Sequence, residues 1–157
     1  MATKSIGTTG RDYSTVALWL ASLPATLTEA EIGECYNDSE FAENIALGAG
    51  ITTSGSNTLT LRAAAGQGIA DHADKDTNPL VYDQSKGVGF RTTDAVILLN
   101  TSSANTVVEG LQFFKDQSGY GNVALTRHLP EKKIVVWSKL CVCPPTLSPA
   151  FSAFGRT

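Results

Sequence analysis

The sequence predicts an all-β fold that carries one short helix near its start. After about residue 40, short runs of β-branched and aromatic residues alternate with turns rich in Gly, Asn, Asp, Ser and Thr. No amphipathic helix of convincing length lies between these runs, which argues against alternating strands and helices. Only residues 14–23 place apolar side chains at helical spacing.

The composition excludes several classes of protein. The 157 residues suit one domain, and 12 basic against 15 acidic side chains give a net charge of −3. The charged fraction of 17% is too low for a long coiled coil or a highly charged disordered chain. Because the chain is not basic overall, we expect no nucleic-acid partner.

The first residues of the chain and its three cysteines favour a protein made in a reducing compartment. The first ten residues lack the apolar stretch of a signal peptide, and no apolar run approaches the length of a membrane helix. We therefore expect synthesis in the cytosol and no membrane partner. The odd set of Cys35, Cys141 and Cys143 suits unlinked thiols better than a disulfide framework or a complete zinc site.

The helix is expected over residues 14–23. Asp12 and Ser14 are candidate N-caps, and Pro24 ends the helix. Four apolar residues share one face of it: Val16, Trp19, Leu20 and Leu23.

The strands are expected at residues 58–62, 80–82, 88–92, 96–99, 106–114 and 134–137. Residues 29–33 fit a short helical turn, but residues 32–36 fit a strand equally well. Leu59 and Leu80 are 21 positions apart, as are Phe90 and Leu111. These spacings hint at the stacked coils of a solenoid, although a β-sandwich would give the same density of strands.

The last part of the chain differs from the rest. Residues 115–157 hold six basic and two acidic side chains, a net charge of +4, whereas residues 1–114 hold six basic and thirteen acidic ones, a net of −7. Three prolines after residue 143 exclude regular structure there. We therefore divide the chain into a body of residues 1–117 and a tail of residues 118–157, which comprises one strand and an extended Pro-rich arm.

Two segments resemble a known family. Residues 10–20 read Gly-Arg-Asp-Tyr-Ser-Thr-Val-Ala-Leu-Trp-Leu, and residues 105–113 read Asn-Thr-Val-Val-Glu-Gly-Leu-Gln-Phe. Together they resemble right-handed parallel β-helix proteins of the pectate-lyase-like group, particularly those of tailed phages and prophages. The resemblance covers residues 3–117. It implies a short right-handed parallel β-helix, in which the helix at 14–23 caps the first coil and Gly110 forms a corner.

The residues that carry chemistry do not assemble into a recognisable site. The acidic stretch at residues 71–76 lacks the Gly and Glu of a calcium loop, because Pro79 and Ser85 stand in their places. His72 and His128 lie far apart, and no nucleophile motif accompanies them. We therefore expect no catalytic, cofactor-binding or metal-binding residues.

Two further groups are assigned structural roles. Arg62 and Arg91 lie in predicted strands and are expected to pair with nearby carboxylates. The alternation of residue types places Phe90 and Phe113 in the core, with Phe114 on another face.

These observations favour a non-enzymatic structural protein of a phage virion, either a capsid decoration protein or the base of a head or tail fibre. We expect a homo-oligomer, with a trimer favoured, that contacts other virion proteins such as the major capsid protein. The candidate interface residues lie in the tail: Lys132, Lys133, Trp137, Phe151 and Phe154. The alternative is a carbohydrate-binding or depolymerising β-helix of the tailspike type.

Overall fold

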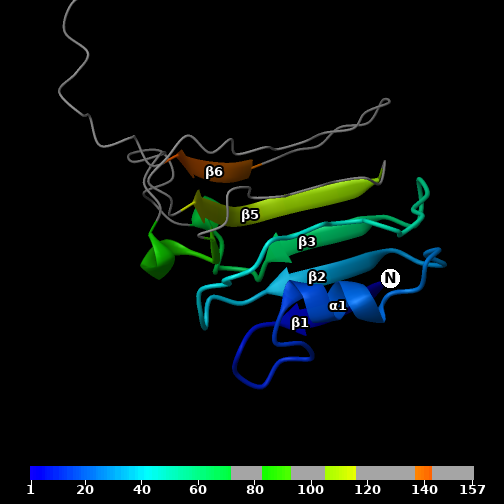
Figure 1. Ribbon diagram of the computed structural model, residues 1–157, viewed down its shortest axis with the longest axis horizontal. Helices are drawn as coiled ribbons and strands as arrows, with labels where there is room; N and C mark the ends of the chain where they lie inside the picture. Colours follow the sequence, from blue (N-terminus) through cyan, green and yellow to red (C-terminus); the bar gives the residue numbers. More distant parts are fainter. Residues whose placement is uncertain (72–82, 93–104, 116–136, 143–157) are drawn as a thin grey trace, which may run out of the picture.

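The computed structural model describes residues 1–71, 83–92, 105–115 and 137–142 (Figure 1). These residues form mostly β-structure with one short α-helix, so the all-β prediction is confirmed at that level. The predicted division at residue 117 lies outside the described residues. The elements are β1 (Ala2–Ile6), α1 (Val16–Ser22), β2 (Glu31–Cys35), β3 (Leu59–Ala63), β4 (Gly89–Thr92), β5 (Thr106–Lys115) and β6 (Trp137–Val142), with 3-10 turns at Ile69–Asp71 and Gln84–Lys86.

All six strands belong to one sheet, and every pair is parallel. The order is β1-β2-β3-β5-β4, and β6 also pairs with β5. Ala2 pairs with Glu31, and Glu31 pairs with Leu59, so successive strands start 29 and 28 residues apart. Parallel neighbours need a crossover. β1, β2 and β3 take successive positions in the sheet, whereas β5 lies between β3 and β4.

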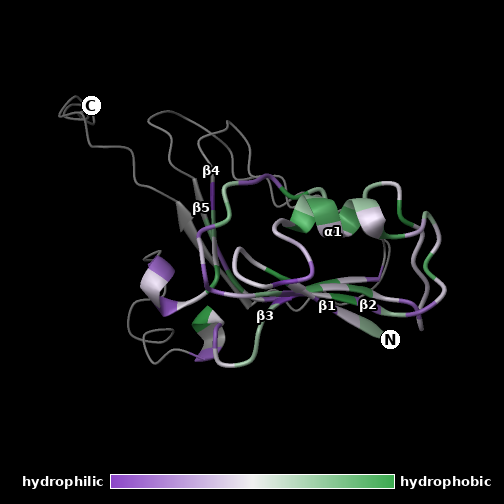
Figure 2. Ribbon diagram, turned by 90° about the horizontal axis from the view of Figure 1, so that it is seen from below, coloured by the Kyte–Doolittle hydropathy of each residue, from purple (hydrophilic) through white to green (hydrophobic). Residues whose placement is uncertain are grey.

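β5 is paired in two halves. Thr106–Glu109 pairs with β3, whereas Gln112–Lys115 pairs with β4. Gly110 lies between the two halves with φ +69°, a conformation that glycine adopts without steric cost. Figure 2 shows β4 and β5 turning toward the side of the sheet on which α1 lies. The sequence correctly places a backbone turn at Gly110.

The predicted spacing of 21 residues is wrong where the structure tests it, between Phe90 and Leu111. Leu59 pairs with Thr106, which lies 47 positions later, and Phe90 pairs with Phe113, which lies 23 positions later. Leu80 lies outside the described residues. Stacking requires only that the strands stay in register, so the segments that join the strands can differ in length. The distance in sequence between paired residues therefore has no fixed value.

α1 is shorter than predicted and has a different N-cap. It spans Val16–Ser22, and Thr15 caps it by accepting a hydrogen bond from the Leu18 N–H at 3.1 Å. The proposal of Asp12 or Ser14 as the cap is therefore wrong. Thr15 has the extended backbone that an N-cap needs, while Asp12 is engaged by Ser5 in β1.

A carboxylate from a distant part of the chain completes the start of α1. The two oxygens of Glu43 accept the N–H groups of Val16 and Ala17 at 2.9 and 3.0 Å. Together with Thr15, Glu43 satisfies the N–H groups of the first three helical residues. A negative charge at this end of a helix is also favourable electrostatically.

The inner face of α1 packs on the sheet. Val16 and Trp19 are fully buried, and Leu20 and Leu23 are partly buried against the same core. Trp19 lies directly over Gly33 of β2, where an added Cβ would stand 2.5 Å from the ring atom Cζ3. The indole ring therefore occupies the space that a side chain at position 33 would need.

The rest of the core is a layer of aliphatic side chains with an aromatic stack. Phe41, Phe90 and Phe113 stack in turn, with ring centroids 4.8 and 5.3 Å apart. The predictions that Phe90 and Phe113 are core residues are confirmed, since they are 2% and 3% exposed. The side chain of Phe114 is outside the described part of the structure.

The cysteine of β2 is a buried free thiol. Cys35 is fully buried, and burial together with the nearby Glu43 and Glu34 carboxylates raises its pKa. β2 is separated from β6 by β3 and β5, so Cys35 does not approach Cys141. Cys143 lies outside the described residues.

Candidate functional site

The two outer edges of the strand series β1-β2-β3-β5-β6 differ in their hydrogen bonding. At the first edge, the Ser5 N–H donates to Asp12 Oδ2 at 2.8 Å, and the Ser5 carbonyl accepts from the Tyr13 N–H at 3.1 Å. The Gly7 N–H in turn donates to the Tyr13 carbonyl at 2.9 Å. Residues 12–13 therefore cover the exposed edge of β1, which is a common way to prevent unwanted strand pairing.

The opposite edge has no such cover within the described residues. β6 pairs with β5, with Trp137 opposite Glu109 and Leu140 opposite Phe113, and no other described segment pairs with β6. Of the predicted interface residues, Trp137 thus lies on the last strand of the series. Lys132, Lys133, Phe151 and Phe154 lie outside the described residues.

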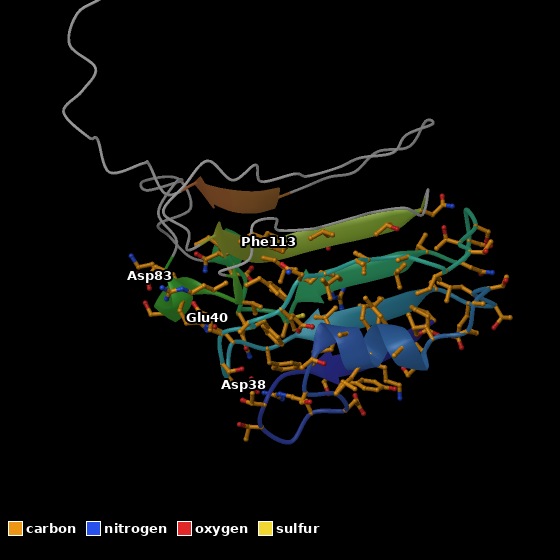
Figure 3. All side chains as sticks on the ribbon, viewed as in Figure 1. Asp38, Glu40, Asp83 and Phe113 are labelled. Atoms are coloured by element: carbon orange, nitrogen blue, oxygen red, sulfur yellow. The ribbon has the colours of Figure 1, made fainter. Side chains whose placement is uncertain are left out.

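A carboxylate clamps the loop that leaves β1. Asp38 accepts hydrogen bonds from the N–H groups of Thr8 at 2.9 Å and Thr9 at 3.3 Å, and from Arg11 Nε at 3.2 Å. The Arg11 guanidinium also lies 3.5 Å from the centroid of the Tyr36 ring. Figure 3 shows Asp38 with Glu40 and Asp83 at one side of the molecule. Asp38 thereby joins the chain after β2 to the chain after β1.

The Asp38 clamp should make stability depend on pH. Partial burial raises the pKa of Asp38, but the hydrogen bonds from Thr8 and Thr9 and the pairing with Arg11 outweigh it, so this pKa lies below its ordinary value. A carboxyl whose pKa is lowered by folding stabilises the protein above its unfolded pKa of about 3.9, and that stabilisation is lost as pH falls through the folded pKa.

We therefore expect Asp38→Asn to lower the free energy of unfolding by about 1–3 kcal/mol at pH 7 and by progressively less below about pH 4. Urea denaturation of both proteins between pH 3 and pH 7 measures the difference. A constant difference over this range would mean that the ionised carboxylate is not what holds the loop.

Amides link successive turns of the chain at the same side of the molecule. Gln84 Nε2 donates to Asn37 Oδ1 at 2.9 Å, and Asn37 Nδ2 donates to the backbone carbonyl of Gln84 at 3.0 Å. Gln112 is fully buried, and its Nε2 donates to the carbonyls of Asp83 and Gly87. These bonds fix the segment that precedes β4.

Two open cavities flank this region, each with a volume of about 380 Å³. They share Gly68 and Asp71, so they adjoin. The first is lined by Arg11, Asn37, Asp38, Gly66, Gln67, Gly68, Asp71, Ser85, Lys86 and Gly87. The second is lined by Glu34, Arg62, Ala63, Ala65, Gly68, Asp71, Glu109 and Gly110.

The charged groups of these cavities are largely paired with one another. Arg62 donates to Glu34 Oε1 from Nη2 at 2.9 Å and from Nε at 3.2 Å. Away from the residues that line the cavities, Arg91 lies 3.9 Å from Glu40. Arg62 and Arg91 therefore both have the acidic partners that the sequence predicted. Arg62 is also in register with Glu109 on β5, which places it between two carboxylates along the sheet.

The described residues contain no group of His, Cys, Asp or Glu that could hold a metal ion. His72, His128, Asp74 and Asp76 lie outside the described residues. Within the described residues, no helix is long and apolar enough to cross a membrane. Burial raises the pKa of the Cys35 thiol, which disfavours the thiolate form that acts as a nucleophile.

The chain matches no protein-family model, no curated protein and no solved structure. Its function must therefore be inferred from its own residues and their arrangement.

Proposed function

We propose that this chain is a non-enzymatic structural subunit of a phage virion, a capsid decoration protein or the base of a head or tail fibre. In this proposal it forms a short right-handed parallel β-helix that acts by docking on neighbouring subunits and on other virion proteins. The observation that carries the proposal is the difference between its two ends. The β1 end is covered by α1 and residues 12–13, whereas β6 pairs with β5 alone among the described strands.

The β-helix is supported by the way the strands follow one another. β1, β2, β3 and the first half of β5 form one parallel series, while β4 and the second half of β5 form another after the turn at Gly110. A parallel bridge between Thr26 and Thr52 indicates that successive coils also pair at a third position around the β-helix. Coils of this kind bury their apolar faces by stacking on neighbours, so a last coil that no described segment covers favours a further protein surface.

The charge distribution supports assembly between subunits. The body carries a net charge of −7 and the tail a net charge of +4. Opposite net charges steer association, with more effect at low salt than at high salt. The tail of one subunit is therefore suited to the body of another, in a symmetric homo-oligomer for which three subunits is the favoured number.

Light scattering of the purified full-length chain tests this proposal. We expect a discrete oligomer, and we expect a variant lacking residues 144–157 to remain folded but to lose assembly. The described core lies between Ile6 and Phe113, so this deletion removes none of it. A full-length chain that stays monomeric at every concentration would exclude the docking function, as would a deletion variant that assembles fully.

The adjoining cavities give the tailspike-type alternative one supporting observation. Glu34, Asp71 and Glu109 line the same groove, as the carboxylates of a saccharide site would, but no aromatic side chain is among the residues that line it. Screening the full-length chain against a glycan array separates the two functions. Glycan binding that Asp71→Asn and Glu109→Gln abolish would favour the alternative.

A further inference from the structure

The solvent-facing side of α1 carries no charge. Residues 13–28 contain no acidic or basic residue, and Asp12 and Glu29 stand at the two borders of this stretch. Ala17, Leu18, Ala21 and Ser22 are exposed on the helix. Leu18 is 54% exposed and, with Met1, is one of two large apolar residues that are exposed in the described structure. We call these four helical residues the α1 outer face.

A helix on the surface of a protein normally turns charged residues toward water. α1 has its buried side on the core through Val16 and Trp19, yet its exposed residues carry no charge. Figure 2 accordingly draws α1 in green and pale shades. Burial of an exposed leucine against another surface is favourable by about 25 cal/mol for each Å² removed from water. The composition of this face therefore suits a protein partner.

We propose that the α1 outer face receives residues 144–157 of a neighbouring copy of this chain. This segment offers matching apolar groups in Leu147, Phe151 and Phe154. Its prolines fix backbone angles in advance, which reduces the entropy lost when an extended segment docks. This inference rests on the proposed function and names the surface through which the subunits assemble.

Charge complementarity supports the same occupant. From Lys132 onward the chain contains four basic residues and no acidic one. The Glu43 carboxylate lies at the first turn of the helix. Asp12 and Glu29 border the α1 outer face in sequence, and Glu29 pairs with the N-terminal ammonium of Met1. A basic segment with apolar side chains thus matches an apolar face that has the Glu43 carboxylate at one end of its helix.

The placement of the elements sets the direction of assembly. α1 lies beside β1 and β2, whereas β6, which precedes the segment, lies at the opposite end of the strand series (Figure 1). A segment that leaves the β6 end of one subunit therefore reaches the α1 end of the next. Such a head-to-tail contact uses two different surfaces, and it closes into a ring when the rotation between subunits permits.

Two full-length variants test the inference by complementation. Leu18→Glu places a charge on the α1 outer face, and the double substitution Phe151→Ser with Phe154→Ser removes the apolar groups of the docking segment. We expect the unmodified chain to assemble and each variant alone to be monomeric by light scattering. Mixed in equal amounts, the two variants should form a dimer and nothing larger, because only one intact face and one intact segment can meet.

Ala46→Glu is the matched control, since it adds the same charge at another exposed position and should assemble as the unmodified chain does. Circular dichroism verifies that each variant is folded, and Ala21→Glu replaces Leu18→Glu if the latter unfolds. Assembly of a folded Leu18→Glu or Ala21→Glu chain would overturn this inference and leave the proposed function standing. Two monomeric variants that fail to form the mixed dimer would also overturn it. A monomeric unmodified chain would overturn the proposed function itself.

Discussion

Replacing Trp19 with alanine is expected to lower the free energy of unfolding by about 3–5 kcal/mol. Trp19 has no exposed surface and is the largest fully buried side chain in the described structure. Its ring rests on Gly33, which has no side chain to fill the space that the indole would leave. The truncation would therefore create a cavity between α1 and the sheet. Urea denaturation followed by circular dichroism measures the loss.

Two controls distinguish packing from other effects at this position. Trp19→Phe should cost less than Trp19→Ala, because it keeps an aromatic ring. Neither variant breaks a hydrogen bond of the buried indole N–H, which has no partner among the described residues. Thr28→Ala changes an exposed residue outside α1 and should alter stability by no more than about 0.5 kcal/mol. Equal effects of Trp19→Ala and Thr28→Ala would show that α1 does not close the core.

Replacing Phe90 with alanine is expected to cost a similar amount, about 3–5 kcal/mol. Phe90 is the middle ring of the aromatic stack, with Phe41 at 4.8 Å on one side and Phe113 at 5.3 Å on the other. Its removal would interrupt both contacts and separate the segment at Phe41 from β5. Urea denaturation again gives the change in the free energy of unfolding.

Phe90→Leu is the matched control, since it keeps most of the buried volume and loses only the stacking, which is worth about 0.5–1.5 kcal/mol for each aromatic pair. A double-mutant cycle with Phe41→Leu isolates the coupling between the two rings. Strictly additive effects of Phe90→Leu and Phe41→Leu would show that the rings contribute burial alone.

The sequence predicted the secondary-structure elements that are determined by residues close together along the chain. Residues 16–22 form a helix because Val16, Trp19 and Leu20 recur on one face, and the helix ends shortly before Pro24. The strands β3, β4 and β5 follow runs of β-branched and aromatic residues, and Gly110 marks the turn between the halves of β5. Residues 29–33 fitted a helical turn and residues 32–36 fitted a strand, and the pairing of β2 with β1 and β3 decides for the strand.

The contacts that the sequence did not predict join residues far apart along the chain. Glu43 caps a helix 26–27 positions earlier, and Asp38 clamps a loop 27–30 positions earlier. No local pattern marks either carboxylate for its role. The spacing between strands was also misjudged, because the paired strands β1, β2, β3 and β5 start 29, 28 and 47 positions apart.

Because each strand pairs only with its neighbours, local unfolding is expected to begin at one end of the strand series. The backbone amides of β2 and β3 lie between strands on both sides, while β6 has one strand beside it within the described residues. In a stack of this kind, partial opening starts at the less protected side and advances one layer at a time. Amide protons would accordingly exchange with solvent in a gradient that is fastest at β6 and slowest beneath Trp19.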